Sequence, residues 1–579
     1  MAEVTLFIDN QTFKVKKEVL CEHSDYFKAM FSGNYVENAK EDIKIDVIDA
    51  NSMSLILNYM NNGFIDLSAY SLNEIAELAV AANFLQISEL IKQIEYCLDL
   101  QLSLTNWMEI MIIAESSSYS KLESLAAAFG LLSFKAMKAE YIPSIAKLYW
   151  YLSHSYLDTC NEIEVFKFGF EWIINRETGA DALLLILCCL DMKKLTSSEL
   201  KEMKTLVTDF PNSLASKVID MLLELSEDNS ESISIVSMTN RKQYLIETFT
   251  ERVYNETFNL VKESKSRELK YVPSVPMWVV KNTKPEVVPH YMYTFTVEKG
   301  FEKWIEVAEK NLWGWNIVEW GPTRLVVVCG EHGRGTGIFM RDVKVYDTLR
   351  KEWISHGVEL PQRRHGGVAI LDDNMYVIGG VGGFRVVLDT AIIYDLKQRS
   401  FREIAKLPDI IQNPAVCTHN RSMYAAGHKN IYRYEHKDDV DTWTMIIETE
   451  IRTSTMISFK DYIYCTQNYF NHLFRFRPGT DMALEMVTYL SNPPAAMCNF
   501  GTRLVIFTRT MCGQSDRISV EEFIGYIDEH PRVLWSESNT ILKINDVAGS
   551  CTLVMSIPPL KTDQPVYHKR YLNMYKDFE

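Results

Sequence analysis

The sequence predicts a multidomain chain in three parts: an α/β module, an α-helical region and an all-β propeller with six blades. Strand-like and helix-like segments alternate in the first hundred residues, and residues 101–225 contain almost no glycine or proline. After about position 275, aromatic strand pairs recur every 42 to 49 residues. At roughly 150 residues per domain, 579 residues allow about three or four domains. We place the parts at 1–100, 101–270 and 271–560, with a C-terminal tail over 561–579.

The first part carries both strand and helix signals. Apolar residues recur at every second position from Val4 to Ile8 and from Ile43 to Val47, which predicts strands with one buried face. The segment Lys17–Phe31 predicts a single helix. Ser71–Glu74 fits a capping box, in which the serine hydroxyl and the glutamate carboxylate satisfy the first backbone N–H groups of a helix.

The middle part predicts successive amphipathic helices. Helical spacing of apolar residues is clear at Ile110–Ala114, Glu123–Met137 and Val165–Ile174. The densely charged residues 241–270 predict a last helix and a linker to the third part.

The third part is a repeat array. In each repeat an apolar strand precedes an aromatic strand, a polar turn and a tryptophan or its equivalent. A period near 40–50 residues with about four short strands per repeat is typical of a β-propeller, whose radial closure leaves few open sheet edges. The predicted pairs are Tyr293 with Trp304, Tyr346 with Trp353, Tyr394 with Phe401, Tyr434 with Trp443, Phe476 with Met486, and Tyr526 with Trp535.

One repeat carries a nearly complete motif. Pro361–Gly367 leads into the strand Met375–Gly380, and Tyr394-Asp395 and Phe401 follow. This order of a basic loop, a strand ending in Gly-Gly, a Tyr-Asp pair and an aromatic residue resembles the kelch repeat. The diglycine allows a close backbone approach near the propeller centre.

The two N-terminal parts resemble domains that accompany kelch repeats. Ser24–Phe31, Leu57–Gly63 and Ala81–Gln86 follow the order and spacing of the BTB/POZ domain. Asn161–Phe166 followed by Trp172 is similar to the BACK domain. The chain thus resembles the BTB-BACK-Kelch family over nearly its whole length. This resemblance implies a non-enzymatic substrate adaptor of a cullin-3 RING ubiquitin ligase, with the BTB and first BACK helices holding the cullin and the propeller holding a client protein.

The resemblance also implies a cullin-binding motif at Tyr35, Val36 and Glu37, a hydrophobic-x-Glu sequence. The hydrophobic side chain would fill a groove on the cullin and the carboxylate would form a hydrogen bond. Tyrosine replaces the commoner methionine or leucine, and an ordinary surface loop is the alternative reading. Because strand residues begin at Val4, a swapped N-terminal helix is missing, and homodimerisation through the BTB domain stays open.

Client recognition is predicted at one mouth of the propeller. The candidates are Arg363, Arg364, Gln412, Asn413 and Arg452, which occupy corresponding loops of successive repeats. Because the arginine guanidinium group binds carboxylates and phosphates through paired N–H donors, an acidic or phosphorylated client peptide is one hypothesis. A solvated charged loop is the alternative.

Enzyme motifs and cofactor or metal ligand sets are absent from the sequence. The phosphate-loop-like stretch Gly333–Gly337 does not open a helix, so we interpret it as a blade loop. Two other classes stay open. One is an actin-binding scaffold; the other is an oxidase, which would need clustered copper ligands.

Composition limits the partners and the compartment. The net charge of −16 disfavours general binding of nucleic acid and of anionic membranes. Eleven scattered cysteines without a C-x-x-C pair indicate reduced thiols. With no signal peptide or membrane segment in the sequence, we expect a cytoplasmic or nuclear protein.

Overall fold

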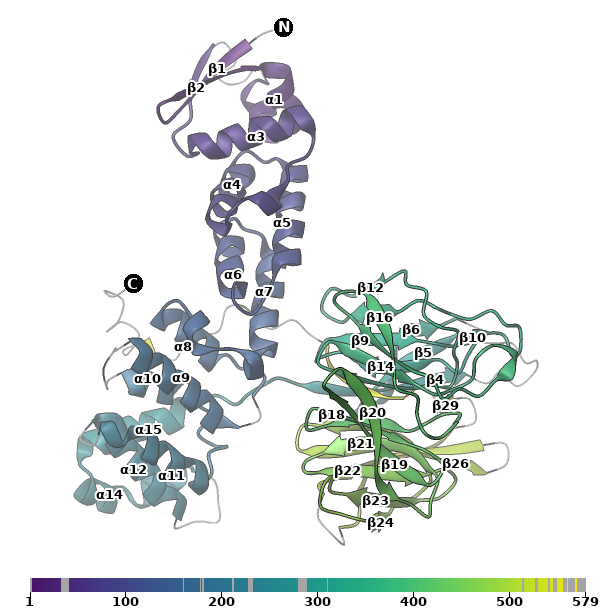
Figure 1. The fold of residues 1–579 in the computed structure, drawn as a ribbon. Coiled ribbons are helices and arrows are strands. Elements are labelled where there is room, and N and C mark those ends of the chain that lie inside the picture. Colours follow the sequence, from purple (N-terminus) through teal and green to yellow (C-terminus); the bar gives the residue numbers. More distant parts are fainter. Residues whose placement is uncertain are drawn as a thin grey trace. The chain divides into compact units, whose positions relative to one another are not determined.

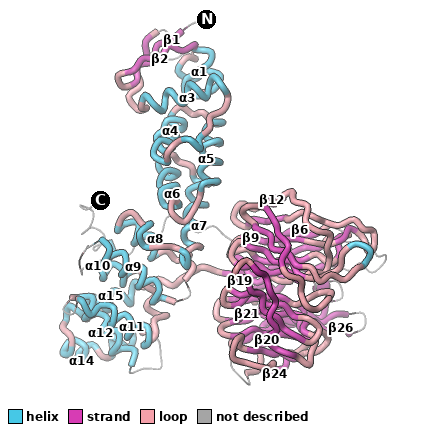
Figure 2. Tube along the Cα trace, in the orientation of Figure 1, coloured by secondary structure: helices cyan, strands magenta, loops and turns pink. Residues whose placement is uncertain are grey.

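The chain folds into two compact units, which are described separately. One comprises residues 1–269 and 557–579 and the other residues 270–556. Helices dominate the first unit and strands the second (Figures 1 and 2). The computed structural model describes residues 3–32, 41–159, 161–176, 179, 182–210, 213–227, 233–279, 289–309, 311–512, 515–525, 529–539, 542–544, 549–555, 560 and 568–569.

The N-terminal module combines a small sheet with helices. Its strand order is β2-β1-β3, with β1 antiparallel to β2 and parallel to β3. Val4, Leu6 and Ile8 point into the core, as the alternation predicts. The elements are β1 (Glu3–Ile8), β2 (Gln11–Lys16), α1 (Lys17–His23), α2 (Asp25–Met30), β3 (Asp42–Lys44), α3 (Ala50–Asn62), η2 (Leu67–Ala69), α4 (Leu72–Phe84) and α5 (Ser88–Gln101).

Two local expectations can be checked in this module. The single helix predicted for Lys17–Phe31 is wrong, because the chain breaks at Ser24 into α1 and α2. The buried Ser24 hydroxyl accepts a hydrogen bond from Phe27 N at 3.2 Å and donates one to Leu85 O at 2.6 Å, so it caps α2 and ties it to the end of α4. The capping box at Ser71 and Glu74 is confirmed at the start of α4.

The helical region continues the same core. The predicted helix over Glu123–Met137 is α7, which begins earlier and ends at Leu132. The elements are α6 (Trp107–Ser116), α7 (Ser120–Leu132), η3 (Phe134–Ala136), η4 (Ala139–Tyr141), α8 (Ile145–Ser153), α9 (Glu162–Arg176), α10 (Ala182–Cys188), α11 (Ser197–Leu206), η5 (Val207–Asp209), α12 (Leu214–Glu227), α13 (Ile235–Asn240), α14 (Lys242–Thr248) and α15 (Glu251–Glu263).

A buried ion pair fastens the residues after α15 to this region. The Arg267 guanidinium contacts both carboxylate oxygens of Glu162 at 3.0 and 3.1 Å, and these side chains are 7% and 1% exposed. Arg267 also donates to the carbonyls of Leu152, His154 and Cys189. The arrangement satisfies both charges, which a buried pair requires.

Two residues near the C-terminus also lie in this unit. The Trp150 indole of α8 donates to Leu560 O at 3.2 Å, and the buried His568 ring lies 2.7 Å from the Tyr149 hydroxyl. The chain therefore returns to the helical region after the second unit. Within the described ranges, none of the helices combines the length and hydropathy that a membrane crossing needs.

The second unit consists mainly of six blade-like antiparallel sheets, as the repeats predict. In blades 1 to 5 the chain forms the innermost strand first and then runs outward strand by strand. Blade 1 is β8 (Asn316–Glu319), β9 (Arg324–Val328), β11 (Lys344–Asp347) and β12 (Glu352–Ser355). Blade 2 is β13 (Gly367–Leu371), β14 (Asn374–Ile378), β15 (Ala391–Asp395) and β16 (Ser400–Ile404), with the short helix η6 (Gly383–Arg385) between β14 and β15.

The next blades follow the same order. Blade 3 is β17 (Val416–His419), β18 (Ser422–Ala426), β19 (Asn430–Lys437) and β20 (Val440–Glu448). Blade 4 is β21 (Thr453–Phe459), β22 (Tyr462–Gln467), β23 (His472–Phe476) and β24 (Glu485–Tyr489). Blade 5 is β25 (Pro494–Phe500), β26 (Arg503–Cys512), β27 (Ser515–Phe523) and β28 (Arg532–Asn539).

Blade 6 joins the two ends of the array. The strands β4 (Tyr271–Val279), β5 (His290–Thr296) and β6 (Gly300–Ala308) come from its start, and β29 (Leu542–Ile544) and β30 (Cys551–Val554) from its end. The inner strand β30 pairs with β4 and contacts β8 and β25, while β13, β17 and β21 complete the ring. The array therefore closes into a propeller consistent with the kelch type.

Three of the predicted aromatic pairs lie directly opposite each other: Tyr346 with Trp353, Tyr394 with Phe401, and Tyr434 with Trp443. Two others are shifted in register. Bulges place Lys303 opposite Tyr293 and Phe474 opposite Met486. In blade 5, Val520 lies opposite Trp535, and Tyr526 falls outside the described residues.

Candidate functional site

The loops of the propeller gather on two faces. The second strand of each blade runs antiparallel to the inner strand; in blade 2, Gly367 pairs with Ile378. The loop that enters the inner strand and the loop that leaves the second strand therefore lie on the same face. We call this the loop face. It contains every residue that the sequence predicts for client binding.

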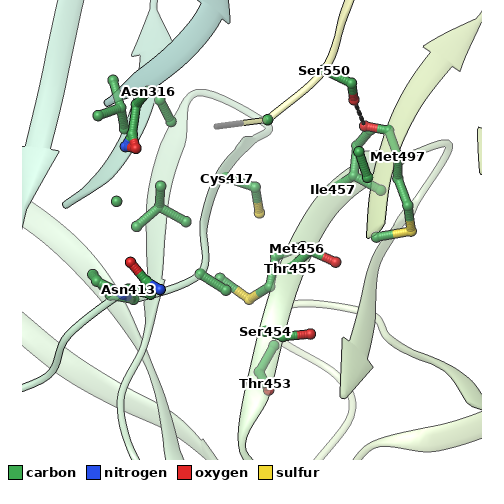
Figure 3. A pocket seen from close by; sticks show the side chains of 18 of the residues that line it. Asn316, Asn413, Cys417, Thr453, Ser454, Thr455, Met456, Ile457, Met497 and Ser550 are labelled. Atoms are coloured by element: carbon green, nitrogen blue, oxygen red, sulfur yellow. Dashed lines mark hydrogen bonds between the residues drawn. The ribbon is translucent and has the colours of Figure 1, made fainter. Parts of the chain in front are cut away.

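A channel opens along the propeller axis. Its cavity volume is about 890 Å³. It is lined by the inner strands of blades 1 to 5 and by Gly549 and Ser550, which directly precede β30 of blade 6. Figure 3 shows labelled side chains from several blades around this space, with Ser550 donating a hydrogen bond of 2.7 Å to Met497 O. The lining is mainly polar backbone and small polar side chains, so the channel offers many weak hydrogen-bonding positions and few charges.

Some polar groups in the channel lining are unsatisfied. Within the described part of the chain, Asn316 Oδ1 and Thr453 Oγ1 are buried without a hydrogen-bond partner. Glu319 also lines the channel, and its residue is solvent-accessible. Desolvation by the surrounding protein raises the pKa of this carboxyl group to about 7, and the hydrogen bond from Thr552 N acts in the opposite direction. The described residues contain no group of three or more metal-ligating side chains.

Three predicted client-binding residues come together at the channel mouth. Gln412, Asn413 and Arg452 all line the cavity. Arg452 and Gln412 are exposed, and the Arg452 guanidinium donates to Gln412 O at 3.3 Å. These residues form a small polar group on blades 3 and 4 that a bound segment can reach.

The other two predicted residues lie outside the cavity lining. Arg363 is only 2% exposed, and its guanidinium donates to Gly379 O, to Thr390 O at 2.8 Å and to Thr390 Oγ1 at 2.9 Å. It therefore holds the ends of β14 and β15 together. Arg364 forms an ion pair with Glu331, and its side chain is 14% exposed.

Exposed apolar side chains on the loop face were not expected from the sequence. Phe384 is fully exposed at 104%, Tyr469 is 79% exposed and Ile338 is 62% exposed. Phe384 directly follows Gly382-Gly383 in a loop, where sequence reasoning looked only for charged and amide residues. An aromatic residue directly after a diglycine, between two predicted strands, was the available signal.

The predicted cullin-binding residues Tyr35, Val36 and Glu37 lie outside the described residues. On the same module, α5 exposes Tyr96 and Leu100, which are 67% and 68% exposed and lie one turn apart on one helix face. Gln93, one turn earlier, donates to Gly63 O at 3.5 Å, next to Phe64, which is 63% exposed. Phe64, Tyr96 and Leu100 define an exposed apolar surface, the α5 patch.

Comparison with known families identifies two segments. Residues 1–102 match the BTB/POZ domain, and residues 362–408 match the Kelch motif. The second match covers blade 2, which carries the nearly complete kelch repeat. Its diglycine has the close backbone approach that the sequence predicts, since a Cβ on Gly380 would lie 2.7 Å from Arg364 O.

The similar proteins are kelch-like proteins. Kelch-like protein 26 of Danio rerio is 28% identical over 204 residues, or 34% of this chain and 33% of the relative. Kelch-like protein 15 of Gallus gallus is 30% identical over 180 residues, or 30% and 36%. Kelch-like protein 6 of Homo sapiens is 22% identical over 438 residues, or 74% and 65%. The first relatives are thus matched over about a third of their length. Together with the fold, these matches are consistent with the BTB-BACK-Kelch family.

Proposed function

We propose that this chain is a non-catalytic substrate adaptor of a cullin-3 RING ubiquitin ligase, with residues 101–270 acting as its BACK domain. The observation that supports this most strongly is a BTB/POZ domain and a closed kelch propeller on one chain. Two binding units on one polypeptide raise the effective concentration of a client near the ligase, and no bond chemistry by this chain is required.

The α5 patch supports a docking role for the N-terminal module. Contiguous exposed apolar side chains on a folded domain mark interaction sites. Aromatic and leucine side chains at helical spacing suit an apolar groove on a helical partner such as a cullin. In this proposal the patch acts with Tyr35, Val36 and Glu37, and the channel mouth with Gln412, Asn413 and Arg452 contributes to client binding.

Pull-down of cullin-3 by the full-length chain tests this function. We expect Leu100→Asp, and separately the pair Tyr35→Ala and Glu37→Ala, to reduce cullin-3 recovery by at least about tenfold, because a buried aspartate or a lost anchor weakens an interface core. Val236→Asp is the matched control, since Val236 is 69% exposed on α13 of the same unit. Absence of cullin-3 with the unmodified chain would defeat the proposal.

A co-sedimentation assay with actin filaments separates the cytoskeletal alternative. The ligase adaptor predicts that the chain stays in the supernatant. Filament binding that survives Tyr35→Ala and Glu37→Ala would favour a scaffold instead.

A further inference from the structure

The loop between β14 and β15 forms a tight turn on the loop face. Val381 pairs with Val387, and Val386 N donates to Gly383 O at 3.2 Å. Between them, Phe384 and Arg385 both have positive φ, 54° and 61°. Two left-handed central residues closed by this hydrogen bond make a type I′ turn.

The residues in this turn are unusual for its geometry. Type I′ turns favour Asn-Gly or Asp-Gly, because side chains with a Cβ are strained at positive φ. Here the central residues are Phe and Arg, although two glycines directly precede them. The Phe384 side chain is fully exposed, so packing within the propeller does not explain it. Strained backbone clusters at binding sites, and here it presents an exposed aromatic ring.

The residue after Phe384 brings this turn next to a loop of blade 1 that also exposes apolar and basic side chains. Arg385 packs beside Gly335 of the neighbouring blade 1 loop. Its Nη2 lies 3.0 Å from the position that a Cβ on Gly335 would occupy. In that loop, Ile338 is exposed, and Arg334 stacks over the Trp313 ring at 4.0 Å. We call the set Arg334, Ile338, Phe384, Arg385 and Val386 the rim patch; Val386 is 56% exposed.

The rim patch carries excess positive charge. The Glu331 carboxylate lies beside the rim patch, but its charge is already neutralised by Arg364. The same carboxylate accepts a hydrogen bond of 2.9 Å from Gly337 N. Burial alone would raise the pKa of Glu331, but hydrogen bonds from Gly337 and Gly335 and the charges of Arg364 and Arg385 lower it overall. Among the described residues, no ion pair involves Arg334 or Arg385. In a chain with a net charge of −16, this local positive charge selects acidic partners.

We infer that the rim patch is a client-recognition surface for an acidic protein segment that contains apolar residues. The inference rests on the proposed adaptor function and names the client's chemistry. Phe384 packs against apolar side chains of that segment, and Arg334 and Arg385 pair with flanking Asp or Glu carboxylates. An aromatic anchor flanked by arginines matches the composition of energetic hot spots at interfaces.

This chemistry is tested with a random library of displayed, unmodified peptides, from which binders to the full-length chain are selected. We expect enrichment of sequences with Leu, Ile, Val, Met or Phe beside several Asp or Glu residues, and weaker binding at higher salt. Enrichment of basic or uncharged sequences, or no enrichment that depends on Phe384, would overturn the inference. Displacement of the peptides by random-sequence RNA from the same patch would also overturn it.

A variant that improves the turn separates binding from folding. Phe384→Asn with Arg385→Gly introduces the preferred type I′ residues, so the melting temperature should stay equal or rise. Affinity for the enriched peptides should fall by at least about tenfold. Tyr489→Asn is the control, because Tyr489 is 53% exposed on the outer strand β24. Unchanged peptide affinity in the double variant would contradict the inference.

The two proposals fail in different ways. Loss of cullin-3 recovery from the unmodified chain, with Phe384-dependent peptide binding intact, contradicts the ligase adaptor alone. Normal cullin-3 recovery without Phe384-dependent peptides contradicts the rim patch alone.

Discussion

At the residue scale, two adjacent arginines have different roles. Both are client-binding candidates in the sequence, and Arg364 is the better placed of the two. The loop before β13 buries Arg363 in the blade and pairs Arg364 with Glu331. The direction of the Arg363 side chain depends on acceptors at Gly379 and Thr390, which the pairing of β14 with β15 holds in place. The sequence predicts the basic loop but not which guanidinium a client can reach.

Arg363→Met should destabilise the propeller. It removes the donors to Gly379 and Thr390 and leaves buried acceptors unsatisfied, which costs about 3 kcal/mol in the free energy of unfolding. Chemical denaturation monitored by tryptophan fluorescence checks this. Arg452→Ala, at an exposed position, should leave stability unchanged; equal stability of both variants would refute a structural role for Arg363.

His290 should make stability depend on pH. Burial beside Trp315, 5.4 Å away between ring centroids, lowers the pKa of His290 to about 4. The native state therefore keeps the ring neutral, whereas the unfolded chain takes up a proton near the ordinary pKa of about 6.5. Stability should be full above pH 6.5 and fall as pH decreases towards 4.

His290→Phe tests this assignment, because an aromatic ring without a titrating nitrogen keeps the packing. The melting temperature of this variant should fall less between pH 6.5 and pH 4.5 than that of the unmodified chain. His428→Ala, at an exposed loop position, should keep the original dependence. Identical pH profiles for all three proteins would show that His290 does not carry the effect.

At the scale of elements, local patterns predict strands and caps well but their ends less well. The capping box at Ser71 needs only residues within one turn, and it forms as expected. The break at Ser24 depends on Leu85, which is 61 positions away, so periodicity alone shows one helix. The aromatic pairs likewise follow the repeat except where bulges shift the register in blades 4 and 6.

The Arg267–Glu162 pair should be essential to the helical region. Arg267→Met leaves the Glu162 carboxylate buried without its counter-charge, which costs about 3–5 kcal/mol. Differential scanning calorimetry of the full chain should show the helical unit melting earlier. The exposed pair Lys92–Glu89 on α5 provides the control, and Lys92→Ala should leave the melting temperature unchanged. A similar small change in both variants would contradict the assignment.

At the scale of the whole molecule, ring closure depends on β30, which the sequence repeats do not reveal. Leu553 is fully buried, Thr348 donates to Val554 O at 2.7 Å, and Ser550 donates to Met497 O. These contacts join the last strand to blades 1 and 5. The period predicts six blades, but which strands complete blade 6 follows only from the pairing of β30 with β4.

Leu553→Asp should therefore weaken the entire propeller. An aspartate at this buried position should lower the free energy of unfolding by about 3 kcal/mol or more, and the transition should become less cooperative. Val297→Asp is the control, since Val297 is 53% exposed in the β5–β6 turn of the same blade. A cooperative transition with unchanged midpoint in Leu553→Asp would contradict closure through β30.

In the proposed function, one end of this chain docks a cullin while the propeller remains available for a client. Calorimetric titration of the cullin-3 N-terminal region into the purified full-length chain tests it most directly. We expect saturable binding of one cullin-3 per chain that Leu100→Asp abolishes and Phe384→Asn with Arg385→Gly leaves unchanged. Absence of saturable binding, or equal loss in both variants, would contradict the claim.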